Sequence, residues 1–383
     1  MISKFDTTKH AQLRGRSVTR YNGSWPRTDS RPGNEAMDEL LAQLRPYEPG
    51  DLEKLAELLG SAGAWPPAAP PTPEDVAARW ARRHIEPRDA VWVLPGPSGE
   101  LVAFAMMWHS SDPTARLTVE LAVLPEWQKR GIGSRLYRMA EQRARQLGLA
   151  HVTSPVYLPI VDLPQDLSAG PMPEIQNQKH ALERSEGSKI QNPKWVLEAR
   201  PESTGFLERR GFFPNSSYVQ MRLDRIGSQP EARWPEGFHF RPMTNIDRDT
   251  ERWAEIIRAT FREPATGPGI AAQLAEPGSS PEGYMFAVEN ESGIEVGTSR
   301  ARIDIMGGRP IGYLGTVGVL PEFRNRGLAT ALIAQTLRYL ASRGLDSAVL
   351  FVETTNLGAR RLYERLGWRP VYQTVHYWKT IED

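Results

Sequence analysis

One stretch decides the fold of this chain: Gly315-Thr-Val317-Gly-Val319-Leu-Pro321-Glu-Phe-Arg324-Asn-Arg-Gly327-Leu-Ala329. An apolar run that ends at a proline predicts a β-strand, and the small residues after it predict a tight turn and the start of a helix. A helix start exposes unpaired backbone N–H groups and the positive end of the helix dipole. With its flanking arginines, this stretch is suited to bind a pyrophosphate.

The pattern occurs twice. The earlier copy is Val119-Glu-Leu-Ala-Val123-Leu-Pro125-Glu-Trp-Gln128-Lys-Arg-Gly131-Ile-Gly133, and matching Gln128 to Arg324 gives a repeat period of about 196 residues. Each copy is preceded by a short strand and an amphipathic helix, at 44–47 and 51–59 in the first and at 240–243 and 249–257 in the second. The sequence therefore predicts two copies of one domain.

Composition excludes several classes of protein. The 383 residues include 47 basic and 46 acidic side chains and no cysteine. The balanced charge argues against general affinity for nucleic acid or membranes, and no apolar run is long enough to span a bilayer. Without cysteine there are no disulfides, thiol nucleophiles or thiolate metal sites, and the histidines show no metal-binding spacing. A polar N-terminus without a signal sequence makes the cytoplasm the expected location.

The chain divides into four expected parts. Residues 1–40 form a basic N-terminal extension without periodicity, and 41–225 form the first domain. A proline-containing linker at 226–236 leads to the second domain at 237–383. The segment 158–193, rich in proline, glutamine and charge, has no counterpart in the second copy and is expected to be a surface loop.

Each domain is expected to be α+β, a mixed but mostly antiparallel twisted sheet flanked by helices. The following strands are predicted: 90–94, 101–108, 117–124, 151–157 and 217–223, then 284–289, 297–305, 311–320, 348–353 and 371–379. The following helices are predicted: 133–146 and 203–212, then 329–342 and 359–368. Each domain is expected to be closed by its own final strand.

The strand, the Gln/Arg-x-x-Gly-x-Gly/Ala loop and a downstream Asn356-x-x-Ala359-x-x-Leu362-Tyr363-x-x-x-Gly367-Trp368 motif resemble the GCN5-related N-acetyltransferase (GNAT) superfamily. The resemblance covers about 340 residues, as two tandem domains. It implies acetyl-CoA or another acyl-CoA as cofactor. It also implies that the strand before the loop splays from its neighbour, so that the pantetheine arm pairs with exposed backbone groups.

By motif position, the resemblance assigns cofactor binding to residues in both domains. In the second domain these are Val317, Gly318, Val319, Arg324, Asn325, Arg326, Gly327, Leu328, Ala329, Thr330 and Asn356. In the first domain they are Leu121, Ala122, Val123, Gln128, Lys129, Arg130, Gly131, Ile132, Gly133 and Ser134. Small residues at the helix start are expected to let the cofactor approach the backbone. Retention of the fold without cofactor binding stays open for the first domain.

The resemblance implies that the residue four before the glycine ending the 359–368 helix protonates the departing thiolate. That residue is Tyr363 in the second domain and Leu207 in the first. Leucine cannot donate a proton, so catalysis is expected in the second domain. The first domain is then expected to be structural, regulatory or substrate-shaping. A tyrosine packed in the core is the alternative interpretation of Tyr363.

The general base is left open. Where the family often places a glutamate, eight residues before the strand's proline, this chain has Leu117 and Tyr313. Glu353 and Asp304 are candidates in the second domain, and a chain of water molecules is another. The backbone N–H of Val319 is expected to donate to the thioester oxygen.

These observations predict an N-acyltransferase that moves an acetyl or other acyl group from acyl-CoA to a primary amine of a small molecule. One alternative uses a longer acyl-CoA or an aminoacyl-tRNA as donor, because the N-terminal extension is basic. Another is a non-catalytic acyl-CoA sensor. Neither a nucleic-acid partner nor a membrane is expected. The protein is expected to be a monomer, as an intramolecular pseudo-dimer, or a homodimer.

Overall fold

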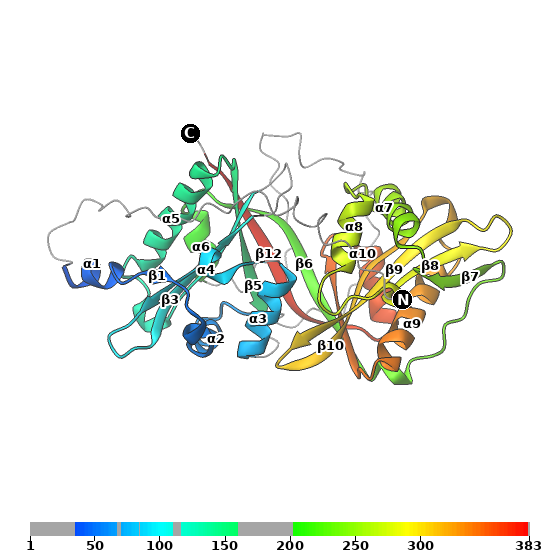
Figure 1. The fold of residues 1–383 in the computed structure, drawn as a ribbon, viewed down its shortest axis with the longest axis horizontal. Helices are drawn as coiled ribbons and strands as arrows, with labels where there is room; N and C mark the ends of the chain where they lie inside the picture. Colours follow the sequence, from blue (N-terminus) through cyan, green and yellow to red (C-terminus); the bar gives the residue numbers. More distant parts are fainter. Residues whose placement is uncertain (1–34, 67–69, 84, 110–115, 160–201, 382–383) are drawn as a thin grey trace, which may run out of the picture.

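The computed structural model describes residues 35–66, 70–83, 85–109, 116–159 and 202–381. Within these residues, twelve strands form one sheet in the order β1-β2-β3-β4-β5-β12-β6-β11-β10-β9-β8-β7. Helices cover both faces of this twisted sheet (Figure 1). Among the described strands, only β4–β5 and β10–β11 pair in parallel. The expected mixed and mostly antiparallel α+β fold is confirmed.

The elements of the N-terminal half are α1 (Glu35–Leu41), β1 (Arg45–Pro46), η2 (Pro49–Asp51), α2 (Leu52–Ser61), α3 (Pro73–Arg82), α4 (Pro87–Ala90), β2 (Val91–Pro95), β3 (Leu101–Trp108), β4 (Leu117–Val123), η3 (Pro125–Trp127), α5 (Ile132–Gln146), β5 (His151–Pro159), α6 (Glu202–Glu208) and β6 (Phe213–Asp224). After η5 (Ile226–Ser228), those of the C-terminal half are β7 (Phe238–Pro242), α7 (Ile246–Phe261), α8 (Gly267–Leu274), η6 (Pro281–Gly283), β8 (Tyr284–Glu289), β9 (Glu295–Met306), β10 (Arg309–Val319), η7 (Pro321–Phe323), α9 (Leu328–Ser342), β11 (Ser347–Glu353), α10 (Leu357–Arg365) and β12 (Arg369–Thr380).

The final strand of each half lies in the sheet of the other half. Strand β12 pairs with β5 and β6, and β6 pairs with β11. Figure 1 shows β6 in green and β12 in red side by side at the middle of the molecule. The expectation that each domain is closed by its own strand is therefore wrong. Both strands are buried on both faces near their middle, and the pattern of apolar residues in a strand does not specify its partner.

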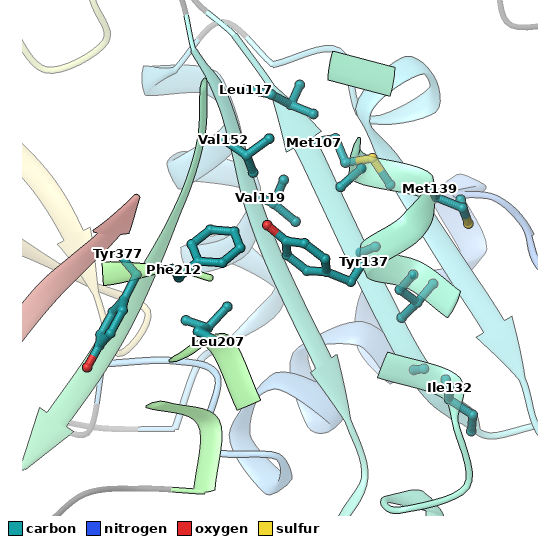
Figure 2. Packing of buried hydrophobic residues seen from close by; sticks show 14 of the residues in the cluster. Met107, Leu117, Val119, Ile132, Tyr137, Met139, Val152, Leu207, Phe212 and Tyr377 are labelled. Carbon is teal, nitrogen blue, oxygen red and sulfur yellow. The ribbon is translucent and has the colours of Figure 1, made fainter. Parts of the chain in front are cut away.

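Each half packs its loop-following helix on the same face of the sheet. In the N-terminal half, α5 and α6 cover a core that includes Leu136, Tyr137 and Phe212 (Figure 2). In the C-terminal half, α9 and α10 cover the equivalent core around Leu337 and Trp368. Helices α2 and α3, and α7 and α8, cover the opposite face. This opposite face of the sheet is called the front face below.

The edges of the predicted parts differ from the structure in three places. Helix α1 lies inside the expected extension, and its Leu40 is buried. The expected linker begins with Ile226, which is buried in the C-terminal core. Helix α3 was not predicted, although Thr72 and Asp75 form a capping box at its start.

Most of the segment 158–193 lies outside the described residues. No described helix has the length and apolar character needed to cross a bilayer.

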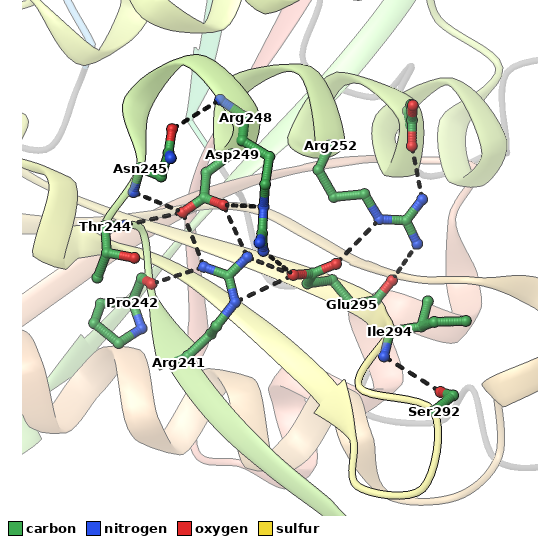
Figure 3. Close-up of polar contacts among 11 residues, drawn as sticks. Arg241, Pro242, Thr244, Asn245, Arg248, Asp249, Arg252, Ser292, Ile294 and Glu295 are labelled. Carbon is green, nitrogen blue, oxygen red and sulfur yellow. Dashed lines mark hydrogen bonds and ion pairs between the residues drawn. The ribbon is translucent and has the colours of Figure 1, made fainter.

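An arginine–aspartate pair fixes the first long helix of each half. Arg45 binds Asp51 through two hydrogen bonds of 2.7 and 2.8 Å. In the C-terminal half, Arg241 binds Asp249 through two of 2.9 Å, and Glu295 joins the network (Figure 3). These pairs anchor α2 and α7 to the edge strands β1 and β7. The second pair thereby positions α7 over the front face.

Candidate functional site

The two predicted loops have nearly the same backbone conformation. In the first, φ is 59° at Lys129 and 88° at Gly131. In the second, φ is 62° at Asn325 and 86° at Gly327. Each loop follows a strand and a single 3-10 turn, and each leads into a helix of 15 residues. The repeat seen in the sequence is therefore also a repeat in local geometry.

The start of each of these helices has free capacity to bind an anion. Neither Gly131 nor Gly327, at the N-cap, provides a side-chain hydrogen bond, and neither first turn contains an acidic residue. The first N–H groups of α5 and α9 therefore remain available, with the helix dipole behind them. Ile132 and Leu328 are each 1% exposed, so these two residues can offer a ligand their backbone only.

The side chains of Gln128 and Arg324 hold their loops in place. Gln128 Nε2 donates to the carbonyl of Val123 at 3.0 Å, and Arg324 Nε donates to the carbonyl of Val319 at 3.0 Å. Each side chain ties its loop to the end of the preceding strand. This structural role was not predicted.

One arginine of each loop lies on an aromatic ring. The guanidinium of Arg130 lies 4.9 Å from the ring centre of Trp127, and that of Arg326 lies 5.2 Å from that of Phe323. Such stacking keeps the charge at the loop surface while it fixes the side chain.

The small residues at the helix starts have reasons of their own. The left-handed φ of Gly131 and Gly327 strains any other residue. A Cβ added at Gly133 would lie 3.4 Å from the ring of Phe206, an ordinary van der Waals contact, so packing alone does not require glycine there. Ala329 packs against a buried cluster in the C-terminal half. Backbone conformation therefore accounts for Gly131 and Gly327 independently of a cofactor.

The strand before each loop parts from its parallel neighbour. Strands β4 and β5 are paired as far as Thr118 and Thr153 and then diverge. Strands β10 and β11 are paired as far as Tyr313 and Val349 and then diverge. We call these two places the N-terminal fork and the C-terminal fork. The predicted binding residues 121–123 and 317–319 lie on their inner edges.

The forks differ in the strand that forms one side. β10 contains a bulge between Gly315 and Gly318, and Thr316 within it has a φ of 53°. A β-branched residue rarely adopts this conformation, and such strain concentrates at functional sites. The bulge also turns backbone groups out of the ladder with β9. β4 pairs with β3 in unbroken register, and Glu120 stands where β10 has Thr316.

Tyr363 lies on α10, whose N-cap is Asn356. The Asn356 side chain accepts a hydrogen bond from the N–H of Ala359 at 3.1 Å, so it caps the helix. The ring of Tyr363 packs edge-on against Trp368. Burial raises the pKa of Tyr363 to about 12, and the nearby phenol of Tyr313 contributes to the rise. The phenol therefore keeps its proton at neutral pH.

The two tyrosines approach the C-terminal fork from opposite faces. Tyr363 packs with the core beneath α9 and α10. Tyr313 is the last residue of β10 that pairs with β11. Its ring lies 4.8 Å from the guanidinium of Arg302 on the front face. The phenol of Tyr313 acts electrostatically on that of Tyr363, so the two hydroxyl groups belong to one region of the molecule. Tyr363 also belongs to the core, so both predicted roles are compatible with its position.

In the N-terminal half, the corresponding residue Leu207 is 4% exposed and packs beside Tyr137 and Phe212 (Figure 2). Leu207 can supply no proton. Near it, the hydroxyl of Ser134 on the first turn of α5 accepts a hydrogen bond from Arg210 at 2.6 Å. Ser134, one of the residues predicted to bind the cofactor, is thus already hydrogen-bonded within the protein.

The N-terminal fork also holds a buried ion pair. Arg79 of α3 donates to Glu120 and to the hydroxyl of Tyr157, and Arg83 adds a second cation. Burial opposes both charges. Even so, the pKa of Arg79 is raised by Glu120, and that of Glu120 is lowered by Arg79 and Arg83, so both stay ionised. Trp65 stacks on Arg79 from another side. The interpretation of Glu120 as a buried structural carboxylate fits this arrangement.

The two proposed carboxylate bases lie in different surroundings. Asp304 forms an ion pair with Arg302 and lies 3.7 Å from Arg82 of α3, so it connects the halves of the molecule. Glu353 is exposed at the end of β11, opposite Tyr218 of β6. The carboxylate of Asp304 is thus engaged in ion pairs, whereas that of Glu353 stays available to act as a base.

Three features of the site were missed: the bulge at Thr316, the cation Arg79 and the carboxylate of Glu263, which lies near Glu353. Only Arg79 had a signal, since the capping motif at Thr72 would have revealed its helix. A bulge has no reliable sequence pattern. Among the described residues, no group of three or more side chains could hold a metal ion.

Comparison with known proteins gives the following findings. A family model described as the acetyltransferase (GNAT) family matches residues 53–159 and 244–368. A mycothiol acetyltransferase of Salinispora arenicola is 27% identical over 345 residues, which cover 88% of this chain and 94% of that protein. One of Kocuria rhizophila is 25% identical over 353 residues, covering 88% and 99%.

Two solved structures share the fold. A GCN5-related N-acetyltransferase from Sphaerobacter thermophilus matches with a TM-score of 0.67 at 23% identity, covering 89% of this chain and 96% of that one. A tandem GNAT protein from the clavulanic acid biosynthesis pathway matches with a TM-score of 0.61 at 18% identity, covering 89% and 98%. The expected tandem arrangement is confirmed.

Proposed function

Because the chain belongs to the GNAT family of acyl-CoA-dependent N-acetyltransferases, we propose that it transfers an acetyl group from acetyl-CoA to a primary amine of a small molecule. We place the reaction at the C-terminal fork. One contrast supports this placement: the strained bulge at Thr316 and the phenol of Tyr363 occur together there, while the N-terminal fork has Glu120 and Leu207 at these positions. The relatives named mycothiol acetyltransferase support a small-molecule acceptor.

In this proposal, the backbone of residues 317–319 pairs with the pantetheine arm, and the first N–H groups of α9 bind the pyrophosphate. The bulge supplies a backbone donor to the thioester oxygen, which gains negative charge as the amine attacks. Tyr363 gives its proton to the sulfur as the carbon–sulfur bond breaks. A phenol with a pKa of about 12 donates to a thiolate only if burial also raises the thiolate's basicity, as an enclosed site does.

The N-terminal half keeps a loop and a fork but lacks a proton donor at the position of Tyr363. We propose that its loop can still bind the phosphates of a second acyl-CoA, while Arg79 and Glu120 close its fork to an acceptor. Its role is then structural or substrate-shaping.

The test follows released thiol during incubation of the protein with acetyl-CoA and a panel of primary amines, beside calorimetric titration of CoA. Tyr363→Phe should reduce turnover strongly and leave CoA affinity unchanged. Tyr339→Phe is the matched control, because it removes a phenol hydroxyl whose partner is the hydroxyl of Ser280. Absence of both turnover and CoA binding would refute the proposal.

A further inference from the structure

The end of α7 lies on the C-terminal fork. A Cβ added at Gly318 would meet the ring of Phe261 at 2.9 Å and the methyl of Thr260 at 3.1 Å, so these side chains rest on β10 just beyond the bulge. Arg324 also donates to the carbonyl of Thr260 at 3.5 Å. Arg262 then turns the chain through a left-handed conformation, with φ of 59°. The next residue, Glu263, is therefore held beside the fork.

A second carboxylate lies on the other side of the fork. Glu353 ends β11, and its register partner on β6 is Tyr218. Burial raises the pKa of Tyr218, and the charges of Glu353 and Glu263 raise it further. Both carboxyl groups are therefore close to one phenol. Glu263 follows the helix over β10 and Glu353 ends β11, and the charge of Glu353 also acts on Glu263.

Among the residues that the structure describes, these two carboxylates differ from their neighbours in having no basic partner. Glu251 pairs with Arg258, and Glu276 pairs with Arg302. Within the described parts of the chain, neither Glu263 nor Glu353 forms an ion pair with a basic side chain. Although Glu263 reaches solvent, the surrounding protein raises its pKa, and the charge of Glu353 adds to the rise. Such a carboxylate takes up a proton more readily than an ordinary one.

We propose that Glu263, acting with Glu353, accepts the protons that the acceptor amine loses. This inference rests on the proposed function and supplies its missing base. The acceptor arrives as an ammonium ion, which two unpaired carboxylates attract. It is therefore a basic primary amine that carries no anionic group beside its nitrogen.

The protons balance as follows. Glu263 takes one proton from the ammonium, and the free amine attacks the carbonyl carbon. Glu353 takes the second as the carbon–nitrogen bond forms and the carbon–sulfur bond breaks, while the sulfur receives the proton of Tyr363. Tyr363 then recovers one proton from the carboxylates, and the other leaves to solvent. The products are the amide, the free thiol and one proton.

The N-terminal half has no such pair. By the repeat, Tyr157 stands where β11 has Glu353, and Arg79 lies between the rings of Tyr157 and Trp65. A buried cation there repels an ammonium ion. The same place in the two forks thus carries opposite charge.

The test is the pH dependence of kcat/KM for the amine, in the full-length protein, for wild type, Glu263→Gln, Glu353→Gln and the double variant. Besides Glu353, the charged and titratable groups on the elements around the fork are Tyr218, Arg116, Arg258 and Arg324, and each could shift the profile although none of them forms an ion pair with Glu263 in the described residues. We expect Glu263→Gln to lower kcat/KM about 100-fold at pH 7. The loss should shrink at high pH, where the amine is already deprotonated in solution, and the affinity for acetyl-CoA should not change.

Glu291→Gln is the matched control, since it removes an exposed carboxylate in the turn between β8 and β9 and should leave the profile unchanged. An acid limb that is unchanged in Glu263→Gln, with activity within about twofold of wild type, would overturn the inference. If Tyr363→Phe is inactive in the same assay, the proposed function survives that result. If Tyr363→Phe is also fully active, the C-terminal site itself is refuted.

Discussion

Glu120 in the N-terminal half and Thr316 in the C-terminal half occupy the same position of the repeat with opposite consequences. Glu120 continues a regular strand and is neutralised by Arg79. Thr316 lies in a bulge with a strained backbone, and this bulge interrupts the ladder of β10 with β9 between Gly315 and Gly318. One duplicated element has thus become a structural ion pair in one half and a candidate catalytic strand in the other.

The ion pair predicts a large loss of stability when one partner is removed. Arg79→Met leaves the buried charge of Glu120 with only Arg83 as counter-charge. We expect a loss of about 3–5 kcal/mol in the free energy of unfolding. Denaturant unfolding of Arg79→Met, Glu120→Gln and the double variant checks this. The double variant should be more stable than Arg79→Met alone, and strictly additive losses would contradict the pairing.

Tyr363→Phe tests the proton donor directly. We expect kcat to fall about 100- to 10,000-fold with little change in the KM for acetyl-CoA, because the donor acts only as the thiolate departs. Since the pKa of Tyr363 is raised to about 12, the wild-type kcat should show no alkaline decline from this group below about pH 10. Steady-state kinetics from pH 6 to about pH 10 measures both. A decline near neutral pH that disappears in Tyr363→Phe would contradict the assignment of its pKa.

Gly327→Ala tests the phosphate loop. Alanine strains the left-handed backbone at this position, so we expect a stability loss of about 1 kcal/mol and weaker CoA binding. Gly293→Ala is the control, because Gly293 also has a positive φ, of 67°, in an exposed turn. Its variant should lose similar stability and keep CoA affinity. Equal effects of both variants on calorimetric CoA affinity would argue against the loop as the binding site.

Asp249 predicts a pH-dependent contribution to stability. Burial alone would raise its pKa, but hydrogen bonds from Arg241 and from the N–H groups of Thr244 and Asn245 lower it to about 2. A depressed pKa means that the carboxylate stabilises the fold above its unfolded pKa of about 4, and that this contribution disappears as the pH falls toward 2.

We therefore expect Asp249→Asn to be less stable by about 2 kcal/mol at pH 6. Unfolding midpoints measured from pH 6 downward should show the two proteins converging in acid. A gap between wild type and variant that stays constant down to pH 3 would contradict the depressed pKa.

The sequence predicted the local parts of this fold well. Helix 133–146 is observed as α5 (Ile132–Gln146), and strand 284–289 is observed with the same bounds. Apolar periodicity and the glycines at the helix ends carry this information within a few residues of chain. The left-handed conformation of Gly131 and Gly327 was not predicted.

The relations between distant segments could not be predicted. The exchange of β6 and β12 depends on which edges meet in space, and both strands would satisfy either partner. The bulge at Thr316 and the meeting of Glu263 with Glu353 depend on how α7 lies over β10. The closure of the N-terminal fork by Arg79 depends on α3, a helix whose position the sequence pattern left unassigned.

Because β6 and β12 each complete the sheet of the other half, the order of synthesis limits when each half can fold during translation. The first half has left the ribosome long before residues 369–380, which supply the strand beside β5, have been synthesised. Strand β6 likewise has no partner until the second half is synthesised, because both of its neighbours, β11 and β12, come from that half. Neither half can complete its sheet alone. Either fragment, synthesised by itself, should therefore have an open sheet edge and be prone to aggregate.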